Sequence, residues 1–277
     1  MRSLGFRRAA SLVVAAIALS RAPLSAHDMW IEPGTFGPAP HEIVAVKLRV
    51  GQDMLGDPLP RDSGLIRQFV IVDASGSRPV VGRDGSNPAG FVSVPQPGLA
   101  VIGYSSNPSS VEETAEKFNQ YLKDEGLDAI AALRAARHET GAGVHEQFSR
   151  CAKSLVLSGP PGGAQGDRVL GFALELVAER NPYVLHSGEE LPVRLTYQDH
   201  PLAGALVVAM NRLNPSEKIS ARTGHDGRVR LRLRPDAGMW LIKAVHMIPA
   251  PAGSNAEWTS YWASLTFELR ATSGEGL

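Results

Sequence analysis

The sequence predicts a mainly β protein, built from two immunoglobulin-like antiparallel β-sandwich units with a small helical insertion in the first. Two observations predict it. Short runs in which apolar and polar residues alternate are separated by Gly and Pro turns through most of the 277 residues, as is typical of antiparallel sandwiches. Between residues 110 and 137 the apolar period changes to that of a helix,. The predicted organisation is a signal peptide at 1–26, an N-terminal β-domain at 27–180, a C-terminal immunoglobulin-like sandwich at 181–270 and a tail at 271–277.

In the first unit, clear alternation or a short apolar run marks each expected strand. Val44, Val46 and Leu48 fall on one face of the first of them, because successive side chains of a strand point to opposite faces,. An Asp-Gly turn at Asp84 separates the second strand from the third,. We expect strands at 42–50, 66–73, 99–104, 148–157 and 169–177.

The helical insertion has its own start and stop signals. The segment 110–113 (Ser-Val-Glu-Glu) matches a capping box, and the apolar residues at 111, 115, 118 and 122 share one helical stripe,. Gly126 is expected to end this helix, and a second, Ala-rich helix follows from Leu127,. The sequence therefore predicts two short helices between residues 110 and 137.

The second unit begins near the Asn-Pro-Tyr segment at 181–183. An Asp-Gly turn at Asp226 precedes a strand in which four arginines alternate with apolar residues, so we expect the arginines to form a solvated sheet face,. The expected strands are 191–197, 201–210, 229–233, 239–248 and 258–269.

The N-terminus carries the features of an export signal. A stretch with three arginines at 2–8 precedes an apolar run at 9–20, and small residues follow, as in a secretory signal peptide,. Cleavage after Ala26 would leave His27 as the first residue of the mature chain, although Leu24 is larger than the residue usually found three positions before the cut. The apolar run is shorter than the roughly 20 residues that span a bilayer. We expect a periplasmic protein with no membrane span after signal cleavage.

Composition excludes several classes of function. The predicted signal peptide holds four of the 28 basic residues and no acidic residue, so the mature chain has 24 basic residues against 28 acidic ones. This balance gives no electrostatic attraction to nucleic acid. The single cysteine, Cys151, excludes a disulfide within the chain and a zinc site built from cysteines. We expect Cys151 to be buried as a small apolar residue.

Five segments of the mature chain resemble a known family. They are HDMWIEP at 27–33, KFNQYLKDEGL at 117–127, EQFSRCAK at 146–153, NPY at 181–183 and WTSYWASLTF at 258–267. With them the chain resembles an exported family of unknown function that is labelled as a periplasmic component of cobalt or nickel uptake (NikM-like). The resemblance covers residues 27 to about 269. It implies a periplasmic β-sandwich that handles a divalent metal, with an inner-membrane metal transporter as a candidate partner.

The candidate metal ligands are His27, Asp28 and His246. An N-terminal His27 would offer its α-amine and its imidazole Nδ1 to one ion, and Asp28 would add a carboxylate oxygen. His246 is the preferred second histidine, on a strand face with Trp240 and Ile242; the alternative is a hydrogen-bonded core histidine. The chain has no His-x-His, His-Glu-x-x-His or Cys-x-x-Cys motif. An open site of histidine and carboxylate suits nickel, cobalt or copper, and copper(II) should bind tightest.

A second group of charged residues lies on the strand that contains Cys151. Glu146 and Arg150 have the same strand parity and are expected to pair with Glu175, close to Lys153. We favour a structural ion pair that fixes sheet register over a catalytic role. Trp258 and Trp262 are expected to pack rather than to form a stacking platform.

No motif of a familiar enzyme class is present. The chain lacks a Gly-x-Ser-x-Gly elbow, a phosphate-binding loop and a dinucleotide fingerprint,. The main hypothesis is a non-enzymatic periplasmic protein that binds nickel, cobalt or copper for uptake or delivery. The alternatives are a metal-free β-sandwich interaction module of the cell envelope, and a copper oxygenase in which a second histidine completes a brace with His27.

Overall fold

The computed structural model describes residues 27–161, 166–186, 189–234 and 237–269. The predicted signal peptide and the tail therefore lie outside the described residues. Within them the chain forms one nine-stranded sheet, two four-stranded sheets and two α-helices, so the expected mainly β fold with a helical insertion is confirmed. No described helix is long and apolar enough to cross a membrane.

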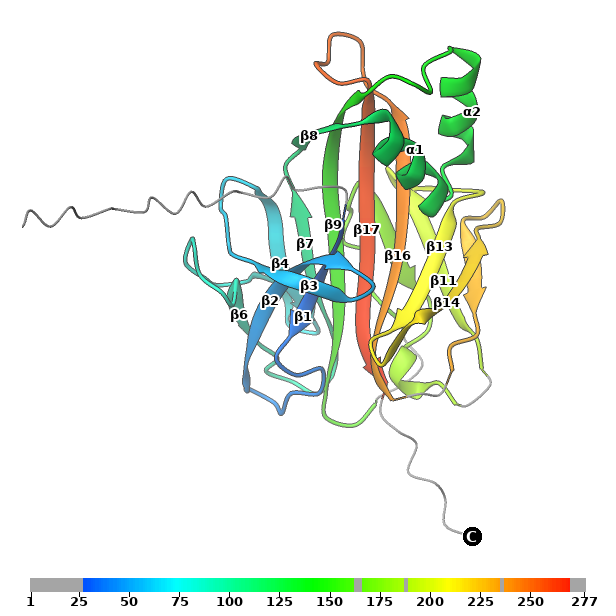
Figure 1. The fold of residues 1–277 in the computed structure, drawn as a ribbon. Helices are drawn as coiled ribbons and strands as arrows, with labels where there is room; N and C mark the ends of the chain where they lie inside the picture. The colour runs from blue at the N-terminus through cyan, green and yellow to red at the C-terminus, as the bar shows by residue number, and fades with distance from the viewer. Residues whose placement is uncertain (1–26, 162–165, 187–188, 235–236, 270–277) are drawn as a thin grey trace, which may run out of the picture.

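The first sandwich packs a four-stranded antiparallel sheet against the N-terminal strands of the nine-stranded sheet (Figure 1). The core between them contains Trp30, Ile31, Val46, Ile71 and Ile102. The smaller sheet consists of β1 (Asp28–Pro33), β2 (Ile43–Gln52), β3 (Leu55–Leu59) and β6 (Gly90–Ser93). The facing strands are β4 (Ile66–Asp73), β5 (Gly76–Pro79), β7 (Gly98–Ser106), β8 (Ser109–Glu113) and β9 (Val144–Ser158).

The second sandwich is built in the same way around Leu176, Leu195, Trp240, Ile242 and Phe267. Its smaller sheet consists of β10 (Leu174–Ala178), β11 (Leu191–Tyr197), β12 (His200–Pro201) and β15 (Arg228–Leu231), and a short 3-10 helix, η1 (Pro182–Val184), separates β10 from β11. The facing strands are β13 (Leu206–Asn211), β14 (Asn214–Arg222), β16 (Gly238–Pro249) and β17 (Trp258–Leu269).

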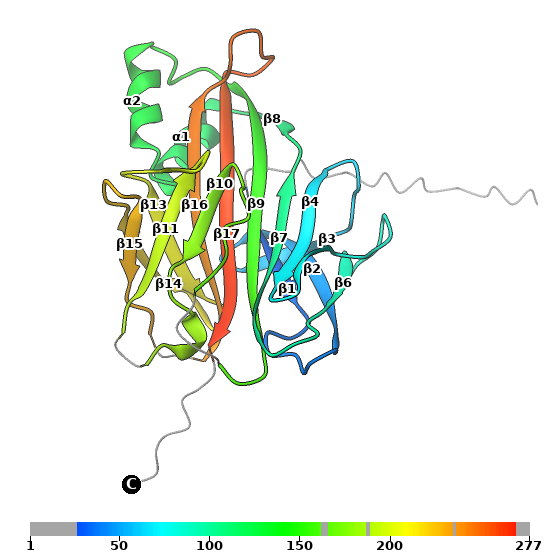
Figure 2. The ribbon, with the colours of Figure 1, turned by 180° about the vertical axis from the view of Figure 1, so that it is seen from behind.

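The long strands β9 and β17 join the two sandwiches (Figures 1 and 2). They pair in parallel, from Trp258 opposite Glu146 to Thr266 opposite Ser154, while the other strand pairs are antiparallel. A parallel pair needs a long crossover connection, and here the chain from β10 to β16 provides it. The two-domain division near residue 180 stays a prediction, and β10, which precedes residue 180, pairs with β11 beyond it.

The two smaller sheets cover opposite faces of the nine-stranded sheet. Along β16, Met239 and Leu241 belong to the core of the first sandwich, whereas Trp240 and Ile242 belong to the core of the second. Side chains of a strand alternate between its faces, so the parity of a residue on β16 decides which sandwich it contacts. His246 has the parity of Trp240 and therefore lies on the face of the second sandwich.

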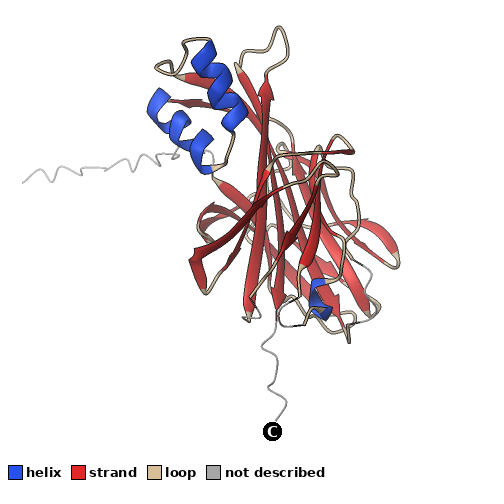
Figure 3. Ribbon diagram, turned by 90° about the vertical axis from the view of Figure 1, so that its right-hand side faces the viewer, coloured by secondary structure: helices blue, strands red, loops and turns tan. Residues whose placement is uncertain are grey.

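The helices α1 (Ala115–Asp124) and α2 (Asp128–Ala136) lie at one end of the sheets (Figure 3). The predicted helix start at Ser110 is wrong, because residues 109–113 pair with β9 as β8 instead. Thr114 is the N-cap, and its hydroxyl accepts a hydrogen bond from the Lys117 N–H at 3.4 Å. Gly126 follows the end of α1 with a φ of 64°, as predicted, because glycine adopts that conformation without steric cost.

Most predicted strands match closely, and the bounds of β4 and β17 agree with the prediction. The strand expected at 169–177 begins only at Leu174. Its first residues donate their N–H groups to the Glu175 carboxylate instead of to a neighbouring strand. The buried Glu175 side chain thus takes the place of a neighbouring strand as hydrogen-bond acceptor for residues 170–172.

Candidate functional site

His27 is held against the sheet at the beginning of β1. Its carbonyl oxygen accepts a hydrogen bond of 2.8 Å from Nη1 of Arg150 on β9. The Arg150 side chain is buried and its guanidinium lies 5.1 Å from the ring centre of Phe148. Burial lowers the pKa of Arg150 to about 10. The first residue of the predicted mature chain is therefore anchored at a fixed place on the fold.

A cavity of about 460 Å³ opens beside His27. Besides His27 and Gln52, it is lined by α1 and the residues next to it: Glu113, Glu116, Lys117, Gln120, Tyr121, Asp124 and Glu125. Four carboxylates against one lysine make it acidic. The His27 Nδ1 is shielded from solvent and has no hydrogen-bond partner among the described residues. Since a buried nitrogen without a partner costs free energy, this atom is where a ligand would be stabilising.

Asp28 is engaged in an ion-pair network. Its Oδ1 lies 2.8 Å from Nζ of Lys243, which also lies 2.6 Å from Oε1 of Glu125. Burial opposes the charge on Lys243, but the two carboxylates outweigh it and raise the pKa of the amine. Burial raises the pKa of Glu125, and Lys243 partly offsets this rise. Asp28 would have to leave Lys243 to coordinate a metal.

His246 lies on the other face of the nine-stranded sheet. It has the parity of Trp240 and Ile242, as predicted, and its ring centre lies 4.5 Å from that of Tyr197. Burial lowers its pKa. It lines a separate cavity of about 380 Å³. The structure thus does not bring His246 together with His27, and a copper brace between them would lack its second histidine.

No group of three or more His, Cys, Asp or Glu side chains is placed to hold a metal ion in the described part of the chain. Signal cleavage would also create an α-amine at His27, a main-chain nitrogen donor in addition to these side chains. Any metal site at His27 therefore has to combine main-chain and side-chain donors.

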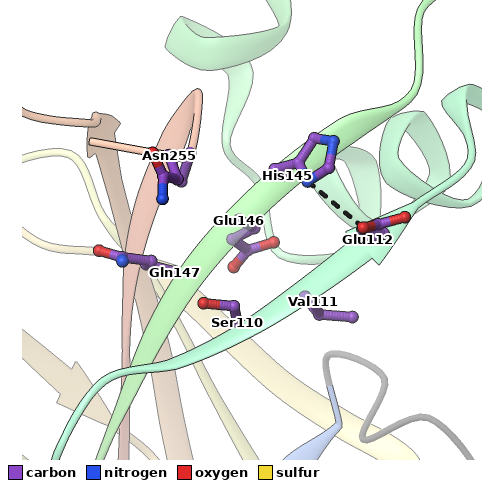
Figure 4. Close-up of a pocket in the computed structure, with 8 residues that line it drawn as sticks. Ser110, Val111, Glu112, His145, Glu146, Gln147 and Asn255 are labelled. Atoms are coloured by element: carbon purple, nitrogen blue, oxygen red, sulfur yellow. Dashed lines mark ion pairs between the residues drawn. The ribbon is translucent and has the colours of Figure 1, made fainter. Parts of the chain in front are cut away.

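A smaller cavity of about 230 Å³ is lined by the paired strands β8 and β9 and by the loop between β16 and β17 (Figure 4). At its rim the His145 Nδ1 lies 3.6 Å from Oε1 of Glu112, and both side chains are exposed. Two donors on an exposed rim do not form a preorganised site. The next residue, Glu146, also lines this cavity but is fully buried.

The Glu146 carboxylate accepts hydrogen bonds from the hydroxyls of Tyr121, at 3.3 Å, and Ser260. Trp262 in turn donates to the Ser260 oxygen, at 3.1 Å. Burial raises the pKa of Glu146 to about 7, although both hydroxyls lower it. Glu146 thus does not join the predicted ion pair, because its partners are these two hydroxyls.

The predicted pairing of Arg150 with Glu175 is wrong. Lys153 has the opposite strand parity and points into the second sandwich, where its Nζ lies 2.9 Å from Oε1 of Glu175. The same nitrogen lies 2.6 Å from Oδ2 of Asp167. Sequence reasoning missed Asp167, because a lone acid beside a Gly-rich stretch carries no periodic signal. It also missed Lys243, which could have been noticed as the one lysine in an otherwise apolar strand.

Three further predictions concern packing or exposure, and the structure confirms them. Cys151 is free and buried, and burial raises its pKa to about 11. Trp258 and Trp262 are buried in the core beside α1. The arginines at 228, 230, 232 and 234 are exposed.

Comparison with known proteins identifies the family and little else. No curated protein matches the chain. A tetra-tandem repeat from the extending region of a large adhesion protein is 13% identical with a TM-score of 0.23, covering 89% of this chain and 50% of that one. The D0–D1 domain of intimin is 10% identical with a TM-score of 0.19, covering 87% and 97%. A Salmonella α-2-macroglobulin mutant is 10% identical with a TM-score of 0.21, covering 93% and 16%.

The chain thus spans about half of the adhesion repeat and a small part of the macroglobulin. The family match is of another kind, because it runs over most of the sequence, from residue 24 to residue 248. The chain belongs to the family described as a domain of unknown function, DUF4198.

Proposed function

We propose that this is a periplasmic protein that binds a divalent transition metal (nickel, cobalt or copper) for uptake or delivery, with His27 as the centre of the site. The observation that carries the proposal is the His27 Nδ1, shielded and without a described partner, beside an acidic cavity. Neutral imidazole nitrogen is the commonest protein ligand of these metals.

The donors can be named from the residues at this place. Cleavage after Ala26 would free the α-amine of His27, which can close a chelate with Nδ1 of the same residue. Glu116 and Asp124 of α1 line the same cavity and offer carboxylate oxygens. The excess of carboxylates also attracts cations. In this form the site needs neither Asp28, which is paired with Lys243, nor His246.

Calorimetric titration of the mature chain with Cu²⁺ and Ni²⁺ tests the proposal. The first variant is His27→Ala; the second adds one glycine before His27, which keeps the imidazole but converts the α-amine to an amide. We expect each to weaken binding by about tenfold or more, since even the loss of a supporting residue costs that much.

His246→Ala is the matched control, because this histidine lies on the opposite sheet face and should leave the affinity unchanged. Equal binding by the wild-type, His27→Ala and extended chains would eliminate the proposal. So would an affinity that depends on His246 alone.

A metal-free interaction module is the second candidate, and one surface favours it. Ile43, Val81 and Phe91 are exposed by 73%, 70% and 47%, and Phe91 is paired with Val81 beside the strand that contains Ile43. Clustered exposed apolar side chains often mark interaction sites. Absence of metal binding, together with loss of envelope association in a Val81→Ser, Phe91→Ser variant, would favour this candidate.

A further inference from the structure

Three charged side chains meet in the core of the second sandwich. Lys153 projects from β9, Asp167 precedes β10 and Glu175 lies on β10. Their side chains are exposed by only 1%, 0% and 1%. The Lys153 Nζ lies 2.6 Å from the Asp167 carboxylate and 2.9 Å from that of Glu175. One amine thus contacts two carboxylates in a place without solvent access.

We propose that Lys153 and Asp167 condense into an intramolecular amide bond, an isopeptide cross-link, and that Glu175 is the catalytic residue of this reaction. The proposal is independent of metal binding at His27, which lies on the other side of the nine-stranded sheet from Lys153.

The fold holds the reacting groups in place. The Lys153 Nζ also donates to the carbonyl oxygens of Arg168, at 2.8 Å, and Leu176, at 3.1 Å. The Asp167 carboxylate accepts from the N–H groups of Arg168, at 2.6 Å, and Ala178, at 3.4 Å. Fixing two reactants in contact removes most of the entropic cost of a bimolecular step. The amine and the carboxyl carbon therefore need little movement to react.

The burial of the cluster makes the reactive form of Asp167 accessible. With one amine and two carboxylates ionised, the cluster would hold an excess negative charge in the core, which is costly. Burial raises the pKa of Asp167 to about 6, although Lys153 lowers it. The neutral acid, the electrophilic form, is therefore accessible near neutral pH. Condensation replaces one positive and one negative charge with a neutral amide, and the Glu175 carboxylate that remains keeps its three backbone N–H donors.

Glu175 is placed to move the protons. Its carboxylate is oriented by the N–H groups of Leu170, Gly171 and Phe172, at 2.7, 2.9 and 3.1 Å. One proton passes from the Lys153 ammonium to the Asp167 carboxylate, which gives a free amine and the neutral acid. The amine nitrogen then attacks Cγ of Asp167, and Glu175 takes a second proton from this nitrogen and delivers it to the departing hydroxyl. General acid–base catalysis requires such contact with the reacting atom.

Atoms and electrons balance without a co-reactant. The new bond joins Nζ to Cγ, and one Cγ–O bond of Asp167 breaks. Two ammonium protons leave with that oxygen as one water molecule, and the third stays on the amide nitrogen. Glu175 ends as the carboxylate it was at the start. Because the surrounding core excludes water, hydrolysis of the amide is suppressed.

The intact mass of the folded, purified and then denatured protein tests the proposal. We expect the wild-type chain to be lighter than its sequence by one water molecule. Trypsin should fail to cut after Lys153, because its amine is acylated, and the next cut falls after Arg168. Residues 151–168 should therefore appear as one internally closed peptide. In Glu175→Gln we expect the full mass and separate peptides 151–153 and 154–168.

Two further variants keep the test decisive. Lys153→Met should have the full mass, and Asp167→Asn should lose ammonia instead of water. A folded wild-type protein with the full sequence mass and normal cleavage after Lys153 overturns the proposal and leaves a buried ion-pair cluster. Loss of water that maps outside residues 151–168 overturns it as well. A closed peptide in Glu175→Gln overturns the catalytic assignment.

Discussion

At the scale of single residues, Glu146 has the most unusual environment outside the cluster of Lys153. Its carboxylate is fully buried, accepts two hydroxyl hydrogen bonds, and its Oε2 has no hydrogen-bond partner in the described structure. The hydroxyls satisfy one carboxylate oxygen but supply no positive charge. Folding therefore favours the protonated form, which is the cause of the raised pKa.

The protonation of Glu146 predicts how stability depends on pH. The pKa rises from 4.5 in the unfolded chain to about 7 in the fold, so the folded state binds more protons between these values. The free energy of unfolding should therefore fall as pH rises from about 4.5 to about 7. Glu146→Gln keeps the shape without the charge, and near pH 8 it should be more stable than wild type by up to about 3 kcal/mol.

Urea unfolding of both proteins at pH 5 and pH 8 measures the difference. Glu112→Gln is the control, because this carboxylate lies on the neighbouring strand β8 and is exposed. A difference between wild type and Glu146→Gln that does not change with pH would contradict the assignment.

The candidate site shows how far strand parity carries a prediction of residue contacts. Parity correctly placed His246 on the face with Trp240. Arg150 and Lys153 have opposite parity, so parity also predicts that they lie on opposite faces of β9. It says nothing about which strand lies opposite. The pairs of Lys153 with Asp167 and of Asp28 with Lys243 connect residues far apart in sequence, so only the tertiary fold determines them.

At the scale of elements, strand periodicity was a good guide and local helix signals were a poorer one. The bounds of β4 and β17 were both predicted; β4 buries every second residue, whereas the middle of β17 is buried on both faces. The capping motif at Ser110 was overridden by pairing with β9, since five residues of β8 gain ladder hydrogen bonds there. The parallel pair of β9 and β17 left no local signal, because it depends on the crossover between distant strands.

The cap of α1 gives a prediction at this scale. Thr114→Ala removes the hydroxyl that accepts from the Lys117 N–H and should lower the free energy of unfolding by about 1 kcal/mol, as for other N-caps. The loss should appear in global unfolding, because Phe118 and Leu122 of α1 pack against Trp258 of the central sheet.

Thr114→Ser keeps the capping oxygen and should recover most of the stability in the same urea titration. If Ala and Ser are equally destabilising, the methyl group of Thr114, not its hydroxyl, is what matters, and the cap assignment fails.

At the scale of the whole molecule, Lys243 connects three separate parts of the chain. From β16 it contacts Asp28 on β1 and Glu125 at the end of α1. The first sandwich, the helical insertion and the central sheet thus share one buried charge. This arrangement also sets the position of His27, since Asp28 follows it directly.

Lys243→Met should therefore destabilise the fold more than Thr114→Ala does. It leaves the carboxylates of Asp28 and Glu125 buried without a counter-charge, and breaking such a buried pair costs about 3–5 kcal/mol. The loss in free energy of unfolding should be smaller at pH 5 than at pH 8, because burial raises the pKa of Glu125 and its protonation removes one of the unpaired charges. Lys218→Met is the control: its ion pair with Asp53, at 2.7 Å, is half exposed, and such pairs contribute at most about 1 kcal/mol. Equal losses in the two variants at pH 8 would show that the Lys243 network does not hold the three parts together.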